Sequence, residues 1–99
     1  MKINLEYDSI SASPELVDYV EKKVGKLERY FDKIVQADVI LKNESGKNTK
    51  QNSCDIRLNV PNDTLFADAS ADTIREAITS ATDSVERQLR KYKEKLQTY

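Results

Sequence analysis

The residues of this sequence best suited to bind a ligand are cations repeated at helical spacing between positions 20 and 34. With 3.6 residues per turn, one face of such a helix carries four of them: Lys22, Lys26, Arg29 and Lys33. The opposite face carries four apolar side chains: Val20, Val24, Leu27 and Phe31. Acidic residues share a third sector: Glu21, Glu28 and Asp32. The charges are therefore expected to be sorted by face. The apolar stripe would pack into a core, and the basic stripe would bind an anion.

A second basic cluster lies near the end of the chain, at Arg87, Arg90, Lys91, Lys93 and Lys95. Residues 22–33 and 86–95 each carry a net charge of +3, whereas residues 1–21 and 55–83 each carry −4. The overall charge of −1 argues by itself against a nucleic-acid binder. Segregation on this scale nevertheless creates local fields that the net charge does not report.

The two basic clusters would merge if their helices pack side by side, giving nine or ten cations on one surface. Phosphate backbones are the usual counterpart of such a surface. The simpler interpretation is an ordinary lysine-rich solvent face, which many amphipathic helices have. Tyr30 lies among the cations and could stack on bases, whereas Tyr92 falls on the apolar face of its helix and is expected in the core.

Groups for catalysis or metal binding are scarce in this chain. It has no histidine, a single cysteine and only two glycines, so it has no glycine-rich phosphate loop. Cys54 falls on the inward side of a predicted strand and is interpreted as a core residue. Neither a disulfide nor an apolar run of membrane-spanning or signal-peptide length is present. We expect a soluble, cytoplasmic protein that is not an enzyme and that needs no cofactor or metal.

Periodicity predicts six elements of secondary structure. Alternation of apolar and polar residues predicts four strands, at about residues 3–7, 35–42, 54–60 and 65–69. Helical spacing predicts two helices, one from Pro14 to Tyr30 or Phe31 and one from Thr73 to about Leu96. Ser13 is the expected N-cap of the first helix, and Asp72 or Ser70 that of the second. Residues 43–53 are expected to form a hairpin loop.

This order predicts an α+β fold in two layers, βαβββα, formed by one domain over residues 1–99. Both helices should pack on one face of a four-stranded sheet. The other face should be wet, with Phe66 as its one conspicuous apolar residue. Small inward residues on the fourth strand should leave space for a bulky element across it. Gly25, inside the first helix, indicates either close packing or close approach of a ligand.

Two segments resemble the signature segments of the ribosome hibernation-promoting factors: KLERYFDKI at residues 26–34 and ERQLRKYKEKL at residues 86–96. This family includes the ribosome-associated inhibitor called protein Y and is also known as the sigma-54 modulation protein family. The resemblance covers essentially the whole chain. It implies a domain similar to the double-stranded-RNA-binding domain, bound to the 30S subunit or 70S ribosome. There it would contact small-subunit ribosomal RNA in the decoding channel and block messenger and transfer RNA, which silences bacterial translation in stress and stationary phase.

The resemblance also implies which residues bind RNA. Carried over by position they are Lys22, Lys23, Lys26, Arg29, Lys33, Arg87, Arg90, Lys91, Lys93 and Lys95. The chain departs from the family at Arg75, where a tyrosine is common, and at Tyr92, where a histidine is common. Because it ends three residues after Leu96, it resembles the short form. A short form is expected to be a monomer off the ribosome and to promote ribosome dimerisation with a separate ribosome modulation factor.

An alternative function follows from the acidic segments, residues 1–21 and 55–83. They could engage a basic protein, which would make the chain a protein-binding regulator of the sigma-factor modulation type.

Overall fold

The computed structural model describes residues 1–11, 13–43 and 52–97. Along the chain its elements are β1 (Lys2–Asp8), α1 (Pro14–Gly25), the short 3-10 helix η1 (Lys26–Arg29), β2 (Gln36–Asn43), β3 (Asn52–Val60), β4 (Asp63–Ala71) and α2 (Ile74–Gln97). The predicted order of strand, helix, three strands and helix is confirmed.

The four strands form one mixed sheet in the order β1-β2-β3-β4. β1 and β2 are parallel, which requires a crossover connection, and α1 is the crossover. β2, β3 and β4 are antiparallel to their neighbours. Pro61 and Asn62 make the turn from β3 to β4, and Asn62 takes the positive φ of 68° that asparagine tolerates. The predicted hairpin loop between β2 and β3 falls largely on residues 44–51, outside the described residues.

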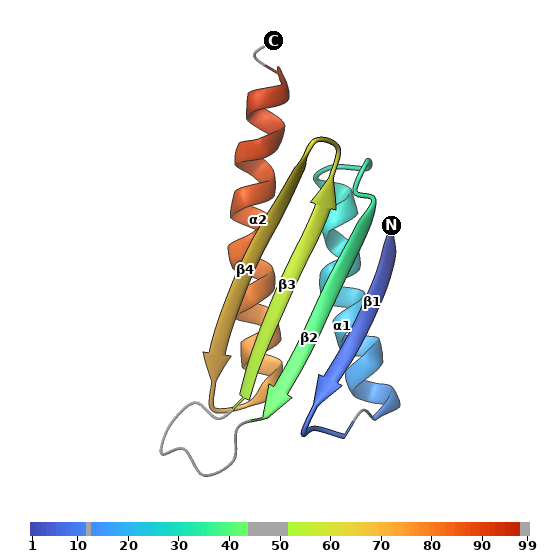
Figure 1. Cartoon of the computed structure of the whole chain (residues 1–99), viewed down its shortest axis with the longest axis vertical. Coiled ribbons are helices and arrows are strands. Elements are labelled where there is room, and N and C mark those ends of the chain that lie inside the picture. The colour runs from blue at the N-terminus through green and yellow to red at the C-terminus, as the bar shows by residue number, and fades with distance from the viewer. Residues whose placement is uncertain (12, 44–51, 98–99) are drawn as a thin grey trace.

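Both helices lie on the same face of the sheet, as predicted, with α1 behind β1 and β2 and α2 behind β3 and β4 (Figure 1). The two central strands supply fully buried side chains to this core, among them Val39, Leu41, Ile56 and Leu58. Ala67 of β4 is 5% exposed and leaves room for α2 to pack close to that strand. The other face of the sheet is not covered by either helix (Figure 1).

The first helix is shorter than the sequence predicts. Regular α-helical geometry ends at Gly25, and the chain continues through a turn of 3-10 helix to Arg29. The backbone N–H of Tyr30 bonds to the carbonyl of Leu27 at 3.0 Å, the i to i−3 spacing of that tighter geometry. Lys33 lies in the turn before β2 and is not helical. The low helix propensity of glycine is consistent with the change of geometry at this residue.

Two further expectations are corrected at the other end of the chain. β4 runs from Asp63 to Ala71 and is longer than the predicted strand. The side-chain oxygen of Thr73 accepts a hydrogen bond from the N–H of Glu76 at 3.1 Å, so Thr73 caps α2 in place of Asp72 or Ser70. Ser70 is part of β4 and therefore lies outside the reach of this cap.

The last turns of α2 extend past the sheet (Figure 1). The hydroxyl group of Tyr92 donates to the carbonyl oxygen of Pro61 at 2.6 Å, which ties the helix to the β3–β4 turn at the end of the sheet. Tyr92 is only 9% exposed, so its predicted place in the core is confirmed. Leu96, one turn further on, is 47% exposed because the sheet no longer lies beneath it. None of the helices in the described ranges is long and apolar enough to cross a membrane.

Replacing Gly25 by alanine is expected to stabilise the fold. The backbone at Gly25 is ordinary right-handed helix, and a Cβ atom placed there meets no described atom within 4 Å. Close packing within the described part of the chain therefore does not explain this glycine. Gly25→Ala should raise the free energy of unfolding by about 0.4–1 kcal/mol, because alanine restricts the unfolded chain and favours helix. Urea denaturation followed by circular dichroism measures the change, and a lower midpoint would contradict the prediction.

Candidate nucleic-acid interface

Side-chain contacts join α2 at one level to α1 and at another to the segment that follows η1. Near the start of α2, the hydroxyl groups of Tyr19 and Thr79 share a hydrogen bond of 2.7 Å. Near its end, the rings of Phe31 and Tyr92 meet edge to face, with centroids 5.3 Å apart. These contacts place the two helices side by side in one layer. The two basic clusters predicted from the sequence therefore belong to the same helical layer.

Tyr30 connects the two clusters directly. The guanidinium carbon of Arg90 lies 4.6 Å from the centroid of the Tyr30 ring, a cation–π contact between α2 and the end of η1. Glu86, one turn earlier on α2, pairs with Arg90 at 3.1 Å. Tyr30, and to a smaller extent Glu86, raises the pKa of Arg90 above its ordinary value. Arg90 is therefore held in place as a permanent cation next to η1.

Arg29 and Lys93 line a common hollow of about 450 Å³ between η1 and the end of α2. Glu28 and Asp32 line the same hollow, so the expected sorting of charge by face is wrong at this end of the helix. The reason is the 3-10 geometry, which turns each residue by about 120° and rotates later side chains away from their α-helical positions. Glu28 is also within 3.2 Å of the N-terminal ammonium group of Met1, which offsets its negative charge.

The remaining predicted RNA-binding residues lie around this centre. Lys22 and Lys23 lie in the last turn of α1, Lys26 begins η1, and Lys33 follows η1 in the turn. On α2 three cations spaced four residues apart form an outer ridge: Arg87, Lys91 and Lys95. With Leu89 buried against the sheet, helix geometry places this ridge on a different side of α2 from Arg90 and Lys93. The ten cations thus share the helical layer but form several groups on it.

Sequence reasoning missed the contact of Arg75, at the start of α2, with Tyr19 and Lys23 of α1. The guanidinium carbon of Arg75 lies 4.7 Å from the Tyr19 ring centroid, and the Nζ atom of Lys23 lies 5.6 Å from it. Arg75 is exposed and has no carboxylate partner among the described residues. A hollow of about 280 Å³ opens beside it, lined also by Thr79. The sequence shows that Tyr19 and Lys23 are four residues apart on one helix. It does not show that Arg75 reaches Tyr19, because Arg75 belongs to the other helix.

The described residues offer little for covalent or metal chemistry. Cys54 is fully buried in β3, and burial raises the pKa of its thiol to about 12. The described ranges hold no group of three or more histidine, cysteine or acidic residues that could bind a metal ion. The interface on the helical layer therefore offers charge, hydrogen-bond donors and aromatic rings, which are groups for binding a polyanion.

Comparison with protein families gives a match over nearly the whole chain. The family model described as "Sigma 54 modulation protein / S30EA ribosomal protein" matches residues 3–97. The match includes both helices and all ten predicted RNA-binding residues.

Individual relatives agree with this match. The chain is 38% identical over 96 residues to a ribosome hibernation promotion factor of Bacillus subtilis, covering 97% of this chain and about half the length of that relative. It is 33% identical over 99 residues to the ribosome hibernation promoting factor of Escherichia coli, covering all of both chains. Its structure resembles the N-terminal domain of Thermus thermophilus protein Y, with a TM-score of 0.81 at 27% identity, over 93% of this chain and 99% of that one.

Cys54 should be unreactive as long as the protein is folded. Its thiol is buried, and with a pKa of about 12 it stays protonated at pH 8, whereas the thiolate is the reactive form. A chromogenic disulfide reagent at pH 8 should label the thiol rapidly in 6 M guanidinium chloride and at least about a hundredfold more slowly in buffer. Equal rates under both conditions would show that Cys54 is accessible in the folded protein.

Proposed function

The chain belongs to the family of sigma-54 modulation proteins and S30EA ribosomal proteins, and we propose that it acts as a ribosome hibernation factor. In this function it binds the small ribosomal subunit and silences translation without catalysing a reaction. The observation that carries the proposal is the match of residues 3–97 to the family model, combined with the cations on or next to the two helices. The expectation that the chain is not an enzyme agrees with the family.

The binding mode we propose is contact between the helical layer and the backbone of small-subunit ribosomal RNA in the decoding channel. Ten cations on or next to α1, η1 and α2 would pair with phosphate groups, each contact releasing a counterion. Tyr19 and Tyr30 hold Arg75 and Arg90 in place before binding, which lowers the entropy lost when the complex forms. Messenger and transfer RNA would then be excluded because the protein occupies their path.

Ribosome pairing is part of the proposal. We propose that the protein is a monomer in the cytoplasm, that it acts as a single ribosome-binding domain, and that it promotes dimerisation of the ribosomes it occupies. A separate ribosome modulation factor would act with it in a cell that makes one. The names of the curated relatives support the hibernation role in general, and the pairing step extends that role.

Reversing charge on the first basic cluster should abolish ribosome binding. The change Lys22→Glu with Lys26→Glu and Arg29→Glu removes three cations from the helical layer and adds three anions. Sucrose gradients of ribosomes mixed with the protein show whether it sediments with 30S, 70S or paired ribosomes. Wild-type binding should fall steeply with salt, with the logarithm of the association constant changing by about −0.7 to −0.9 per phosphate contact for each unit of log salt.

The matched control carries the same change of net charge on the open face of the sheet. Lys2, Lys42 and Arg57 alternate with inward residues on their strands, and replacing all three by glutamate leaves the helical layer intact. This control should still bind. Equal loss of binding in both triple variants, or none in either, would contradict an RNA interface on the helices, provided that circular dichroism shows both to be folded.

Arg75 provides a narrower test, because it is absent from the residues carried over from the family. Arg75→Gln removes one cation next to Tyr19 and should lower the magnitude of the salt slope by about 0.7–0.9, the value for one phosphate. Arg57→Gln on the open face should leave the slope unchanged. An unchanged slope for Arg75→Gln would limit the interface to the two basic clusters predicted from the sequence.

A further inference from the structure

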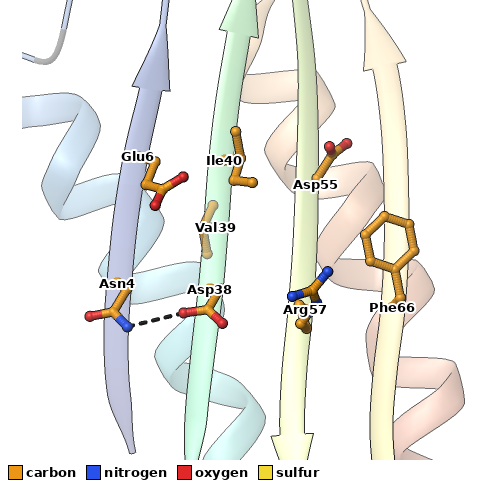
Figure 2. Close-up of a pocket in the computed structure, with 8 residues that line it drawn as sticks. All are labelled: Asn4, Glu6, Asp38, Val39, Ile40, Asp55, Arg57 and Phe66. Carbon is orange, nitrogen blue, oxygen red and sulfur yellow. Dashed lines mark hydrogen bonds between the residues drawn. The ribbon is translucent and has the colours of Figure 1, made fainter.

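The open face of the sheet, opposite the helices, carries a hollow of about 480 Å³. Figure 2 shows that side chains from all four strands surround it. Asn4, Asp38, Arg57 and Phe66 form one row across the sheet in the observed register, and Glu6, Ile40, Asp55 and Asp68 form the next row. The acidic segments near the N-terminus and in the second half of the chain therefore meet on this face.

Two carboxylates on this face lie directly opposite each other. Asp55 of β3 pairs in register with Asp68 of β4, an arrangement that destabilises a sheet because like charges face each other at short range. Lys42 offsets only one of them, with its Nζ atom 3.4 Å from Asp55. Neither Glu6 nor Asp68 has a hydrogen bond or ion pair with any residue in the described ranges. The fold thus tolerates uncompensated negative charge at this position.

In the row that contains Asp38 and Arg57, in contrast, the charges are compensated within the protein. Asp38 accepts hydrogen bonds from Asn4 at 3.0 Å and from Gln36 at 2.8 Å, and these two bonds lower its pKa, with the nearby Arg57 as a smaller cause. Arg57 faces Asp38 in the register, so these two charges offset each other. Of the remaining carboxylates in and beside the hollow, Asp55 shares its charge with Lys42, whereas Glu6 and Asp68 are open to an outside cation.

Phe66 adds an apolar and aromatic component. It is 48% exposed and lines the hollow together with Ile40. An exposed aromatic ring next to carboxylates is suited to a guanidinium or ammonium group, which can pack on the ring and pair with the acids. Outward side chains of the strands include five carboxylates and three cations, a net charge of −2, which disfavours a phosphate backbone.

We propose that this open face is a docking surface for a basic segment of a protein. Arginine or lysine side chains of that segment enter the hollow, where one packs on Phe66 beside Asp55 and Asp68 on β3 and β4, and another pairs with Glu6 on β1. Charge complementarity selects this occupant over RNA. The protein then has two faces with opposite partners, since the helical layer binds a polyanion and the sheet binds a polycation. A partner of this kind on the ribosome rests on the proposed function, whereas docking of a basic peptide on the free protein does not.

The free protein provides the first test. Hexa-arginine peptide is titrated into ¹⁵N-labelled protein at about 150 mM salt, where weak surface pairing is largely screened. Amide shifts should change at the outward residues of β1 to β4. Phe66→Ala should raise the dissociation constant about three- to fivefold, and the triple variant Glu6→Gln, Asp55→Asn and Asp68→Asn about tenfold. Shifts confined to the helices would overturn the proposal. So would an affinity of both variants for the peptide that equals the affinity of the wild-type protein.

Ribosomes carrying the bound protein provide the second test. A carbodiimide reagent joins a carboxylate to an amine only when the two are in contact, so it reports a protein neighbour and not RNA. Mass spectrometry should find Glu6, Asp55 or Asp68 linked to a lysine of a ribosomal protein, and the triple variant should lose this link. A matched variant, Glu15→Gln with Asp18→Asn and Asp83→Asn, removes three carboxylates from the helices and should keep it.

Two outcomes on the ribosome would overturn the docking surface. One is the absence of any link through these three carboxylates, and the other is ultraviolet cross-linking of Phe66 to ribosomal RNA, which would show that nucleic acid covers the face. If the protein does not sediment with ribosomes at all, the proposed function fails. The peptide titration then decides the docking proposal without the ribosome.

Discussion

Burial of one face of the sheet beneath both helices is the constraint on which the rest of the structure depends. Ile56 and Leu58 of β3 are fully buried on that side. Because side chains alternate along a strand, Asp55 and Arg57 must then point to the opposite side. The same alternation applies to the other three strands, so the molecule has one face made of helices and one face made of polar strand residues. A shift of register by one residue would exchange the two sets and place charges in the core.

The tyrosines between the helices combine packing with the positioning of charge. Tyr19 bonds to Thr79 and holds Arg75, while Tyr30 holds Arg90. Tyr19 lies in α1 and Tyr30 directly follows η1, whereas both arginines lie in α2, so helix packing and cation placement depend on the same contacts. An arginine stacked on a ring loses less freedom on binding phosphate than a free side chain does. The charged layer is thereby preorganised by the interaction that joins the helices.

Much of the fold was predictable because it follows from local periodicity. The strands, the order of elements, the helices on one face and the burial of Tyr92 all follow from patterns that repeat within a few residues. The end of the first helix was not predictable in this way. The i, i+3 and i, i+4 spacing continues through η1, and nothing in that pattern distinguishes a 3-10 turn from a further α-helical turn. The Thr73 cap was missed because Ser70, Asp72 and Thr73 all have side chains able to cap a helix.

The sequence alone therefore determined that two basic helical segments and two acidic segments exist, and that each helix has an apolar stripe to bury. Tertiary structure decided which of these charges meet. Arg75 reaches Tyr19, and Asp55 faces Asp68, only after strand register and helix packing bring distant segments together. The physical reason is that a periodic pattern specifies the direction in which a side chain points from its own element. It does not specify the neighbour found in that direction, because this depends on the alignment of two elements along their lengths.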